Sequence, residues 1–298
     1  MAGREKTVAR LALLAGAIVW GIIWYPYRLL EQAGLSGLRA SLLSYLIALG
    51  LGLLFLHPQL RNLKAPRLSP MLLLIGLAAG ACNLGYVLAT LHGEIMRVLL
   101  LFYLAPLWTV AWSRLLLKER LNRAGTAVIA LSLGGAVTML WRPELGAPWP
   151  ANGAEWLGLA AGFMFALSNV LVRRAEHLSI EVKSLAVFAG VVLLGLALMP
   201  FDVPPSGAAL RLTQMQPWHW GMLGLLGMLL LVINLVVQHG LTHTPANQAI
   251  VIFLFELVVA ALASWLLAGE SMGLQEWTGG AMIIAASLFS GHMERSEA

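Results

Sequence analysis

Several residues recur in this sequence at one fixed separation, and some of them are polar side chains inside strongly apolar stretches. At an offset of 151 positions the matches are Met71 with Met222, Gly76 with Gly227, Asn83 with Asn234, His92 with His243, Phe102 with Phe253, Ser113 with Ser264 and Glu119 with Glu270. Amide, imidazole and carboxylate side chains can bind a polar solute within an apolar protein. Matches of these types indicate an internal duplication, which is typical of secondary transporters.

The residues that most enzymes need for catalysis are missing from the sequence. Asp202 is the only aspartate, which excludes an intramembrane pair of catalytic aspartates, and Cys82 is the only cysteine, which excludes a cysteine metal cluster. The motifs His-Glu-x-x-His, Gly-x-Ser-x-Gly and Gly-x-x-x-x-Gly-Lys do not occur. We therefore predict a protein that is not an enzyme, with no catalytic residues, no metal site and no cofactor.

The composition places this chain in a lipid bilayer. Hydrophobic residues make up 59% of the chain and charged residues only 11%, whereas charged residues average about 25% in soluble domains. Spans of roughly 20 residues are predicted at about 8–29, 38–56, 70–92, 94–116, 124–141, 156–173, 184–200, 219–241, 246–267 and 277–293. The fold class is therefore an all-α integral membrane protein with ten transmembrane helices and no soluble domain.

Lysine and arginine residues are distributed unevenly between the two sides of the predicted membrane. Fourteen of the 19 lie on the side of the N-terminus and five on the other side. The positive-inside rule then places both termini in the cytoplasm, and the clustering of basic residues at span ends argues against a nucleic-acid partner. The first apolar stretch passes through Trp20 to Pro26 without a small-residue cleavage pattern, so we expect an uncleaved span rather than a signal peptide.

Each copy of the duplication contains five spans, which has a geometric consequence. Because five is odd, the second copy enters the membrane from the opposite side, and the two halves are inverted. The first spans of the halves match at an offset of 145, which aligns Trp20 with Phe165 and Arg28 with Arg173. We predict a first repeat over residues 1–141, a periplasmic linker over 142–155 and a second repeat over 156–293.

The chain resembles the two EamA repeats of the ten-span drug/metabolite transporter superfamily. The motifs that carry this resemblance are Trp20-Gly21, Ala105-Pro106, Leu117-Lys118-Glu119-Arg120-Leu121, Phe255-Glu256-Leu257, Leu267-Ala268-Gly269-Glu270 and Trp277-Thr278-Gly279-Gly280. Two positions depart from the family pattern: Leu257 stands where proline is frequent, and Ala105 stands where a glutamate would match Glu256. A proline-dependent bend is therefore expected in span four, and a bend in span nine is left open.

The resemblance implies a central cavity lined by spans one, three, four, six, eight and nine, with spans five and ten as a scaffold. Within the superfamily the aromatic-rich sequence is similar to bacterial aromatic amino-acid exporters of the YddG type. The predicted substrate-binding residues are Trp20, Asn83, Tyr86, Tyr103, Asn169, Asn234, Gln238 and Gln248. The predicted gating or coupling residues are Trp24, Arg97, Pro106 and Glu256.

Several of these residues have a second interpretation. Asn83 and Asn234 are equally suited to interhelical hydrogen bonds that clamp the bundle. Trp20 and Trp24 share one helix face, which fits stacking on an aromatic solute but also fits an aromatic belt at the membrane interface.

Two charged residues also have two interpretations. Arg97 follows Glu94 by three positions, so an ion pair within the helix competes with a role as an anchor for a substrate carboxylate. Glu256 is the only acidic residue predicted near mid-membrane, where it would either couple transport to protons or make a structural hydrogen bond.

The sequence therefore predicts a carrier that exports small amphipathic metabolites from a bacterial cytoplasm by alternating access. Amino acids with aromatic or bulky apolar side chains are the favoured substrates, and the carrier is expected to lie in the inner membrane and to act as a monomer. A carrier of nucleosides or cationic compounds is the alternative. A channel or a membrane scaffold is the competing class, although inverted repeats mainly serve alternating access.

Overall fold

The computed structural model describes residues 2–56, 69–141, 143–145, 149–202, 214–268 and 272–293, in which it contains helices and no β-strand. The α-helices are α1 (Ala2–Gln32), α2 (Gly37–Phe55), α4 (Pro70–His92), α5 (Ile95–Phe102), α6 (Ala105–Trp112), α7 (Arg123–Leu140), α8 (Gly153–Arg174), α9 (Ile180–Leu198), α10 (Pro217–His243), α11 (Ala246–Phe253), α12 (Phe255–Ala268) and α13 (Leu274–Phe289). A π-helix, η1 (Ser113–Leu117), continues α6, and the 3₁₀ turns are η2 (Pro143–Leu145), η3 (Met199–Phe201) and η5 (Ser290–His292).

Nine helical stretches among the described residues are long and apolar enough to cross a membrane. In two of them shorter helices follow one another: α5, α6 and η1 form one stretch, and α11 and α12 form another. The tenth predicted span corresponds to α13, which has 16 residues and is shorter than the usual span of about 20. Each predicted span is thus helical, two of the spans are interrupted, and the last span is short.

Polar residues at the predicted span ends begin many of these helices. The side chains of Ser36, Ser69, Asn122, Asn152 and Ser179 each accept a hydrogen bond from a backbone N–H in the first turn of the helix that follows. These bonds satisfy donors that have no partner inside the helix. Serine and asparagine therefore fix where the apolar segments start.

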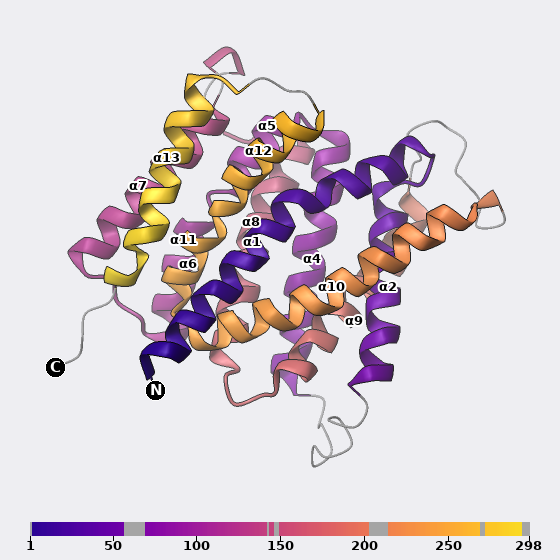
Figure 1. Ribbon diagram of the computed structural model, residues 1–298, viewed down its shortest axis with the longest axis horizontal. Coiled ribbons are helices and arrows are strands. Elements are labelled where there is room, and N and C mark those ends of the chain that lie inside the picture. Colours follow the sequence, from indigo (N-terminus) through magenta and orange to yellow (C-terminus); the bar gives the residue numbers. More distant parts are fainter. Residues whose placement is uncertain are drawn as a thin grey trace.

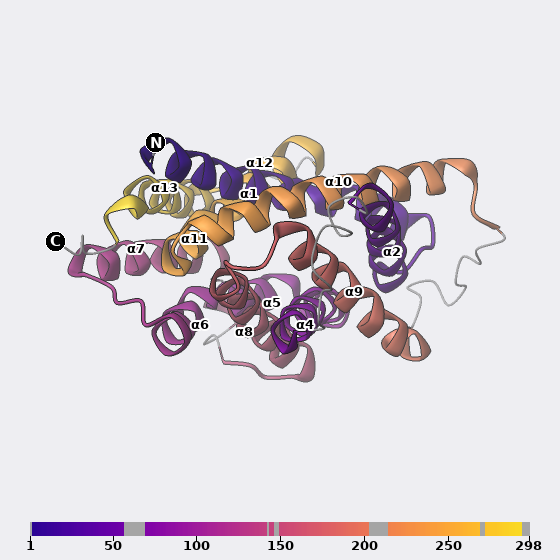
Figure 2. The same cartoon turned by 90° about the horizontal axis from the view of Figure 1, so that it is seen from below.

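The helices form two layers, and each layer contains helices from both halves of the chain (Figure 2). In one layer α1 packs against α10 and α12, and in the other α8 packs against α4, α5 and α6. The first helix of each half thus contacts the third and fourth spans of the other half. The pairs α7 with α13 and α2 with α9 close the two edges. This reciprocal packing confirms two inverted five-span repeats.

Small residues let the edge helices approach closely. A Cβ atom added to Gly279 of α13 would lie 2.5 Å from the carbonyl oxygen of Gly135 in α7. A Cβ atom added to Gly190 of α9 would lie 1.9 Å from the carbonyl oxygen of Gly76 in α4. Neither space accommodates a side chain, so glycine is needed where α13 meets α7 and where α9 meets α4.

The two ends of the bundle differ in charge. At one end of the bundle α8 finishes with Arg173 and Arg174, and Lys183 lies in the first turn of α9, close to Glu181. We call this the basic end; α1 begins there and α13 finishes there, at the lower side of Figure 1. At the opposite end, Asp202 pairs with Arg39 at 2.7 Å and accepts a hydrogen bond from Ser36 at 2.8 Å.

Candidate functional site

Spans four and nine are both broken at the same place in their repeats. Tyr103 and Leu104 separate α5 from α6, and Leu254 separates α11 from α12. Tyr103 and Leu254 are 151 positions apart, so they match in the duplication. Interrupted helices in corresponding positions of two inverted halves are the best structural pointer to a transporter binding site.

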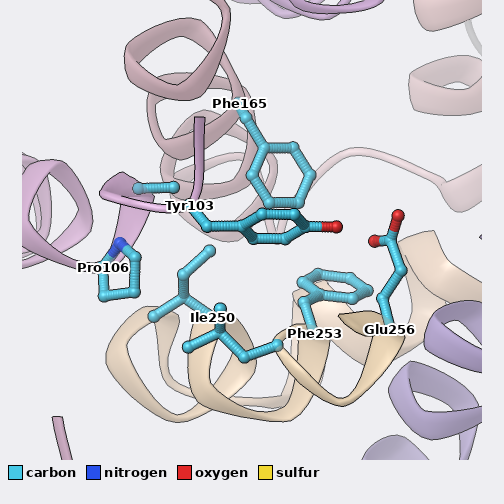
Figure 3. A pocket seen from close by; sticks show the side chains of 8 residues that line it. Tyr103, Pro106, Phe165, Ile250, Phe253 and Glu256 are labelled. Atoms are coloured by element: carbon cyan, nitrogen blue, oxygen red, sulfur yellow. The ribbon is translucent and has the colours of Figure 1, made fainter. Parts of the chain in front are cut away.

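A narrow pocket lies where these two breaks meet. Tyr103 and Pro106 come from the first break, Glu256 from the second, and Phe165 from α8 lies between them (Figure 3). The complete lining is Tyr103, Ala105, Pro106, Phe165, Ile250, Phe253, Leu254 and Glu256. The lining is apolar apart from one phenol and one carboxylate.

The polar groups of the pocket face each other. The Tyr103 hydroxyl points toward the Glu256 carboxylate, and the Phe253 ring lies beside both side chains (Figure 3). Glu256 lies in the first turn of α12, where the positive end of the helix dipole favours a carboxylate. The pocket therefore offers one acidic or hydrogen-bonding group within an aromatic wall.

Four aromatic rings connect α4, α5, α8 and α11 through this region. The ring centroids are 5.1 Å apart for Tyr86 and Phe102, 5.5 Å for Phe102 and Phe165, and 5.7 Å for Phe165 and Phe253. These separations are typical of favourable aromatic pairs. Because two rings come from each half, the cluster joins the repeats at the pocket.

A glycine of the opposite half packs against each broken helix. A Cβ atom added to Gly162 of α8 would lie 2.3 Å from the carbonyl oxygen of Phe102, next to the first break. A Cβ atom added to Gly21 of α1 would lie 2.9 Å from the carbonyl oxygen of Glu256, next to the second break. The glycine of the Trp20-Gly21 motif thus makes close backbone packing possible at this place.

The structure brings only some of the predicted site residues together. Tyr103, Pro106 and Glu256 line the pocket, and Tyr86 reaches it through Phe102. Trp20 is partly buried against the large hydrophobic core around α1. The Arg28 guanidinium lies 5.9 Å from the Trp24 ring centroid.

Two predicted amides bond away from the pocket. Asn83 donates to the Tyr45 hydroxyl of α2 at 3.2 Å, which is the interhelical arrangement expected of a clamp. Gln248 donates to the Ser290 hydroxyl at 3.4 Å, near the end of α13.

Three other predicted amides are buried between α8 and α10 with polar atoms that have no partner. Asn169 is 7% exposed, Asn234 is 9% exposed and Gln238 is 3% exposed. The unpaired atoms are Nδ2 of Asn169, Oδ1 of Asn234 and Oε1 of Gln238. Because unpaired buried polar groups are costly, these three residues remain candidates for contact with a polar solute.

Arg97 forms a long-range ion pair. Its guanidinium donates to both carboxylate oxygens of Glu155, at 2.9 and 3.1 Å, and to the backbone oxygen of Trp149 at 2.8 Å. Glu155 also accepts from the backbone of Ala151 and the side chain of Asn152. Arg97 therefore holds the start of α5 against the start of α8, with a partner 58 positions away rather than the predicted neighbour Glu94.

Glu119 of the matched glutamate pair connects the halves at the basic end. Its carboxylate accepts from the backbone N–H of Ala246 at 3.2 Å and from the side chain of Asn247 at 3.2 Å. Asn247 also donates to the Ser113 hydroxyl at 2.9 Å. The carboxylate thus satisfies the start of α11, while its match Glu270 lies outside the described residues.

The apolar pocket residues Ala105, Phe165, Ile250, Phe253 and Leu254 are absent from the predicted set. Signals in the sequence point to two of them: Phe253 matches Phe102 at the 151 offset, and Phe165 matches Trp20 at the 145 offset. The pocket is lined by the fourth, sixth and ninth spans. The wider cavity lined by six spans stays a prediction.

Comparisons with known proteins agree with this architecture. Residues 7–141 and 152–291 each match the EamA-like transporter family. An uncharacterized transporter, YojE, from Bacillus subtilis (strain 168) is 25% identical over 78% of this chain and 76% of its own length. The pseudopaline exporter CntI from Pseudomonas aeruginosa (strain UCBPP-PA14) is 25% identical over 87% of this chain and 88% of its own.

One solved structure, titled only as a crystal structure of a protein, superposes on the chain with a TM-score of 0.74. It covers 95% of this chain and 96% of its own at 19% sequence identity. At that identity the similarity shows the fold alone.

Proposed function

Because the chain belongs to the EamA-like transporter family, whose members are transporters and not enzymes, we propose that it exports small amphipathic metabolites by alternating access. Aromatic and bulky apolar amino acids are the substrate class that we assign. The observation that carries this proposal is the pocket at the two matched helix breaks, where aromatic side chains surround a single phenol and a single carboxylate. Such a lining suits a solute with an apolar body and a small polar group.

The inverted repeats supply the mechanism. Two packings of equivalent elements can exchange when one half rocks against the other, so the pocket opens first to one side and then to the other. The broken helices α5–α6 and α11–α12 would move with opposite halves, because each is packed against the first helix of the other repeat. Substrate would bind where the two moving layers meet.

Orientation follows from the distribution of charge. We assign the basic end to the cytoplasm, with both termini there, and place the chain in a bacterial inner membrane as a functional monomer. Tags at either terminus are expected to resist labelling from the periplasm in intact cells. Labelling of a terminus from outside would overturn this orientation and the export direction.

Counterflow in proteoliposomes tests the transport proposal. Vesicles loaded with unlabelled solute should accumulate labelled phenylalanine, tryptophan or leucine, whereas nucleosides and cationic drugs should not be exchanged. Pseudopaline belongs in the panel because one relative is named as its exporter. A channel would show no stimulation by solute on the far side, and a scaffold would show no flux.

Tyrosine variants test the place of binding. Tyr103→Ala removes a pocket wall, and Tyr86→Ala removes the ring that supports Phe102, so both should reduce exchange strongly at matched expression. Tyr25→Ala is the control, because Tyr25 contacts Trp24 and does not line the pocket. Unchanged exchange in both pocket variants would remove this pocket from the transport path.

A further inference from the structure

Lys183 is a fully buried cation with no carboxylate partner among the described residues. Its side chain is 0% exposed, and its Nζ donates to the Thr242 hydroxyl at 2.5 Å. That hydroxyl in turn donates to the backbone oxygen of Gln238 at 2.7 Å. An ammonium group has three donors, and burial of a charge without an opposite charge is unfavourable.

Charged groups of both signs lie near Lys183: Arg173 and the acidic residues Glu176 and Glu181, neither of which forms an ion pair with it in the described part of the chain. Lys183 lies in the early part of α9, where the positive end of the helix dipole disfavours a cation. Arg173, at the end of α8, donates to the backbone oxygen of the same Thr242. Glu176 contacts Arg173 at 3.2 Å, but its side chain is 63% exposed. A purely structural role explains this placement poorly, because a neutral side chain would be less costly there.

A row of polar residues leads from Lys183 to the pocket. On α8, Phe165, Asn169 and Arg173 follow at intervals of four, so they share one face. On α10, Asn234, Gln238 and Thr242 have the same spacing. The bond from Arg173 to Thr242 joins the two faces at the basic end, and Phe165 lies in the pocket wall about 12 Å away along the helix axis.

The amides of this row carry the unpaired donor and acceptor atoms described above. Asn169 offers a free N–H, and Asn234 and Gln238 offer free carbonyl oxygens. A solute with an ammonium and a carboxylate group could satisfy both kinds of atom.

We infer that Lys183, supported by Arg173, is the carboxylate-recognition site at the basic mouth of the transport path. The inference rests on the proposed function, because it assigns the charged group of the transported solute. When the basic end opens, a carboxylate would contact the Lys183 ammonium, and the apolar part would then move along the amide row to the aromatic pocket. Solutes of the same shape without the carboxylate are recognised less well.

Thermal unfolding of the purified protein tests the site without requiring transport. Phenylalanine and 3-phenylpropionate carry the carboxylate, and phenylalaninamide lacks it; all are compared at equal ionic strength in neutral phosphatidylcholine. The carboxylates should raise the Tm of the wild type more than the amide does. Lys183→Met should weaken the apparent affinity for the carboxylates by about tenfold or more, which is the loss of one charge-assisted hydrogen bond, and leave the amide unchanged.

Matched variants separate recognition from folding. Lys118→Met removes an exposed lysine at the same end and should respond to the probes like the wild type, and Lys183→Arg should retain part of the carboxylate preference. Equal Tm shifts by carboxylates and amide in the wild type would overturn the inference even if Lys183→Met does not fold. Stabilisation by added phosphatidylglycerol but not by the carboxylates would assign the site to lipid and would also overturn it.

Counterflow distinguishes this inference from the proposed function. Exchange of phenylalanine with no carboxylate preference would leave the transporter assignment in place and remove the role of Lys183. Carboxylate-dependent stabilisation without any exchange would support the site and contradict aromatic amino-acid transport.

Discussion

The two helix breaks at the pocket occupy matched positions but are built from different residues. The first contains Pro106 in the opening turn of α6, as the sequence predicts. The second has Leu257 in the matching position and no proline, yet α11 and α12 are still separated at Leu254. Since proline is present at only one break, it cannot be the common cause.

The feature that the breaks share is a glycine from the other half. Gly162 packs on the Phe102 carbonyl at the first break, and Gly21 packs on the Glu256 carbonyl at the second. Each contact is too close for a Cβ atom to be added without movement of the backbone. Both breaks therefore lie where a glycine of the other repeat packs closely on the backbone, whereas proline is present at only one of them.

The largest expected effect comes from filling one of these contacts. Gly162→Val would place its side chain against the Phe102 carbonyl, where even a Cβ atom would lie at 2.3 Å. Overpacking of this kind costs about 1–3 kcal/mol and sometimes more, so we expect a clear fall in Tm and loss of exchange. Gly224→Val is the control, because a Cβ atom at Gly224 meets nothing within 4 Å. A wild-type Tm for Gly162→Val would contradict packing as the cause of the break.

Hydropathy and duplication predicted most of the fold. Spans were found because lipid requires long apolar helices, and the inversion followed from an odd number of spans in each repeat. The break at Leu254 has no proline to indicate it, and the residue that packs beside it, Gly21 of α1, is more than two hundred positions away in the sequence. Local sequence carries no signal for such a contact.

The site was harder to predict than the fold. Tyr103 and Glu256 were found because polar groups in apolar spans are conspicuous. Phe165 and Ile250 were missed because an apolar residue that lines a pocket looks the same in sequence as one that faces lipid. For Arg97 the sequence offers an ion pair with Glu94 or a role as an anchor for a substrate carboxylate, because it carries no signal that α5 and α8 begin side by side, where Glu155 is the observed partner.

The second prediction concerns the carboxylate that only the second break contains. Ala105 matches Glu256 in the first repeat, so no second mid-membrane carboxylate is available for a proton relay. We expect facilitated transport driven by the substrate gradient, and Glu256→Gln should preserve exchange at equal pH because it keeps a hydrogen-bonding group beside Tyr103.

Flux measurements with an imposed pH gradient check this expectation. Wild-type flux should change little with the gradient, and Glu256→Gln should behave in the same way. A steep dependence in the wild type that disappears only in Glu256→Gln would show that the carboxylate carries a transported proton.

A third, smaller effect is expected from removal of the proline at the first break. Pro106 lies in the first turn of α6, where a missing N–H is tolerated. Pro106→Ala should lower stability by about 1 kcal/mol or less, mainly through greater freedom of the unfolded chain, and should leave exchange active. Amide hydrogen exchange over residues 102–108 in the variant would report whether the break persists; slow exchange typical of a continuous helix would show that proline is required.

The smallest expected effect lies at the end of η1, where the first repeat has a strained backbone conformation. Lys118 follows η1 with φ of 60°, and it is the one non-glycine residue with positive φ among the described residues. The left-handed conformation costs about 1–2 kcal/mol for an L-residue with a Cβ atom, and the second repeat has glycine at the matching position 269.

Glycine at position 118 would remove that cost, but the greater conformational freedom of the unfolded chain would destabilise the folded protein by about 0.5–1 kcal/mol. Lys118→Gly should therefore leave the protein as stable as the wild type or more stable by up to about 1.5 kcal/mol, whereas Lys118→Ala, which loses the same charge and keeps the Cβ atom, should not be stabilised. Equal Tm values for the two variants would show that the left-handed residue stores no strain and that this turn does not distinguish the repeats.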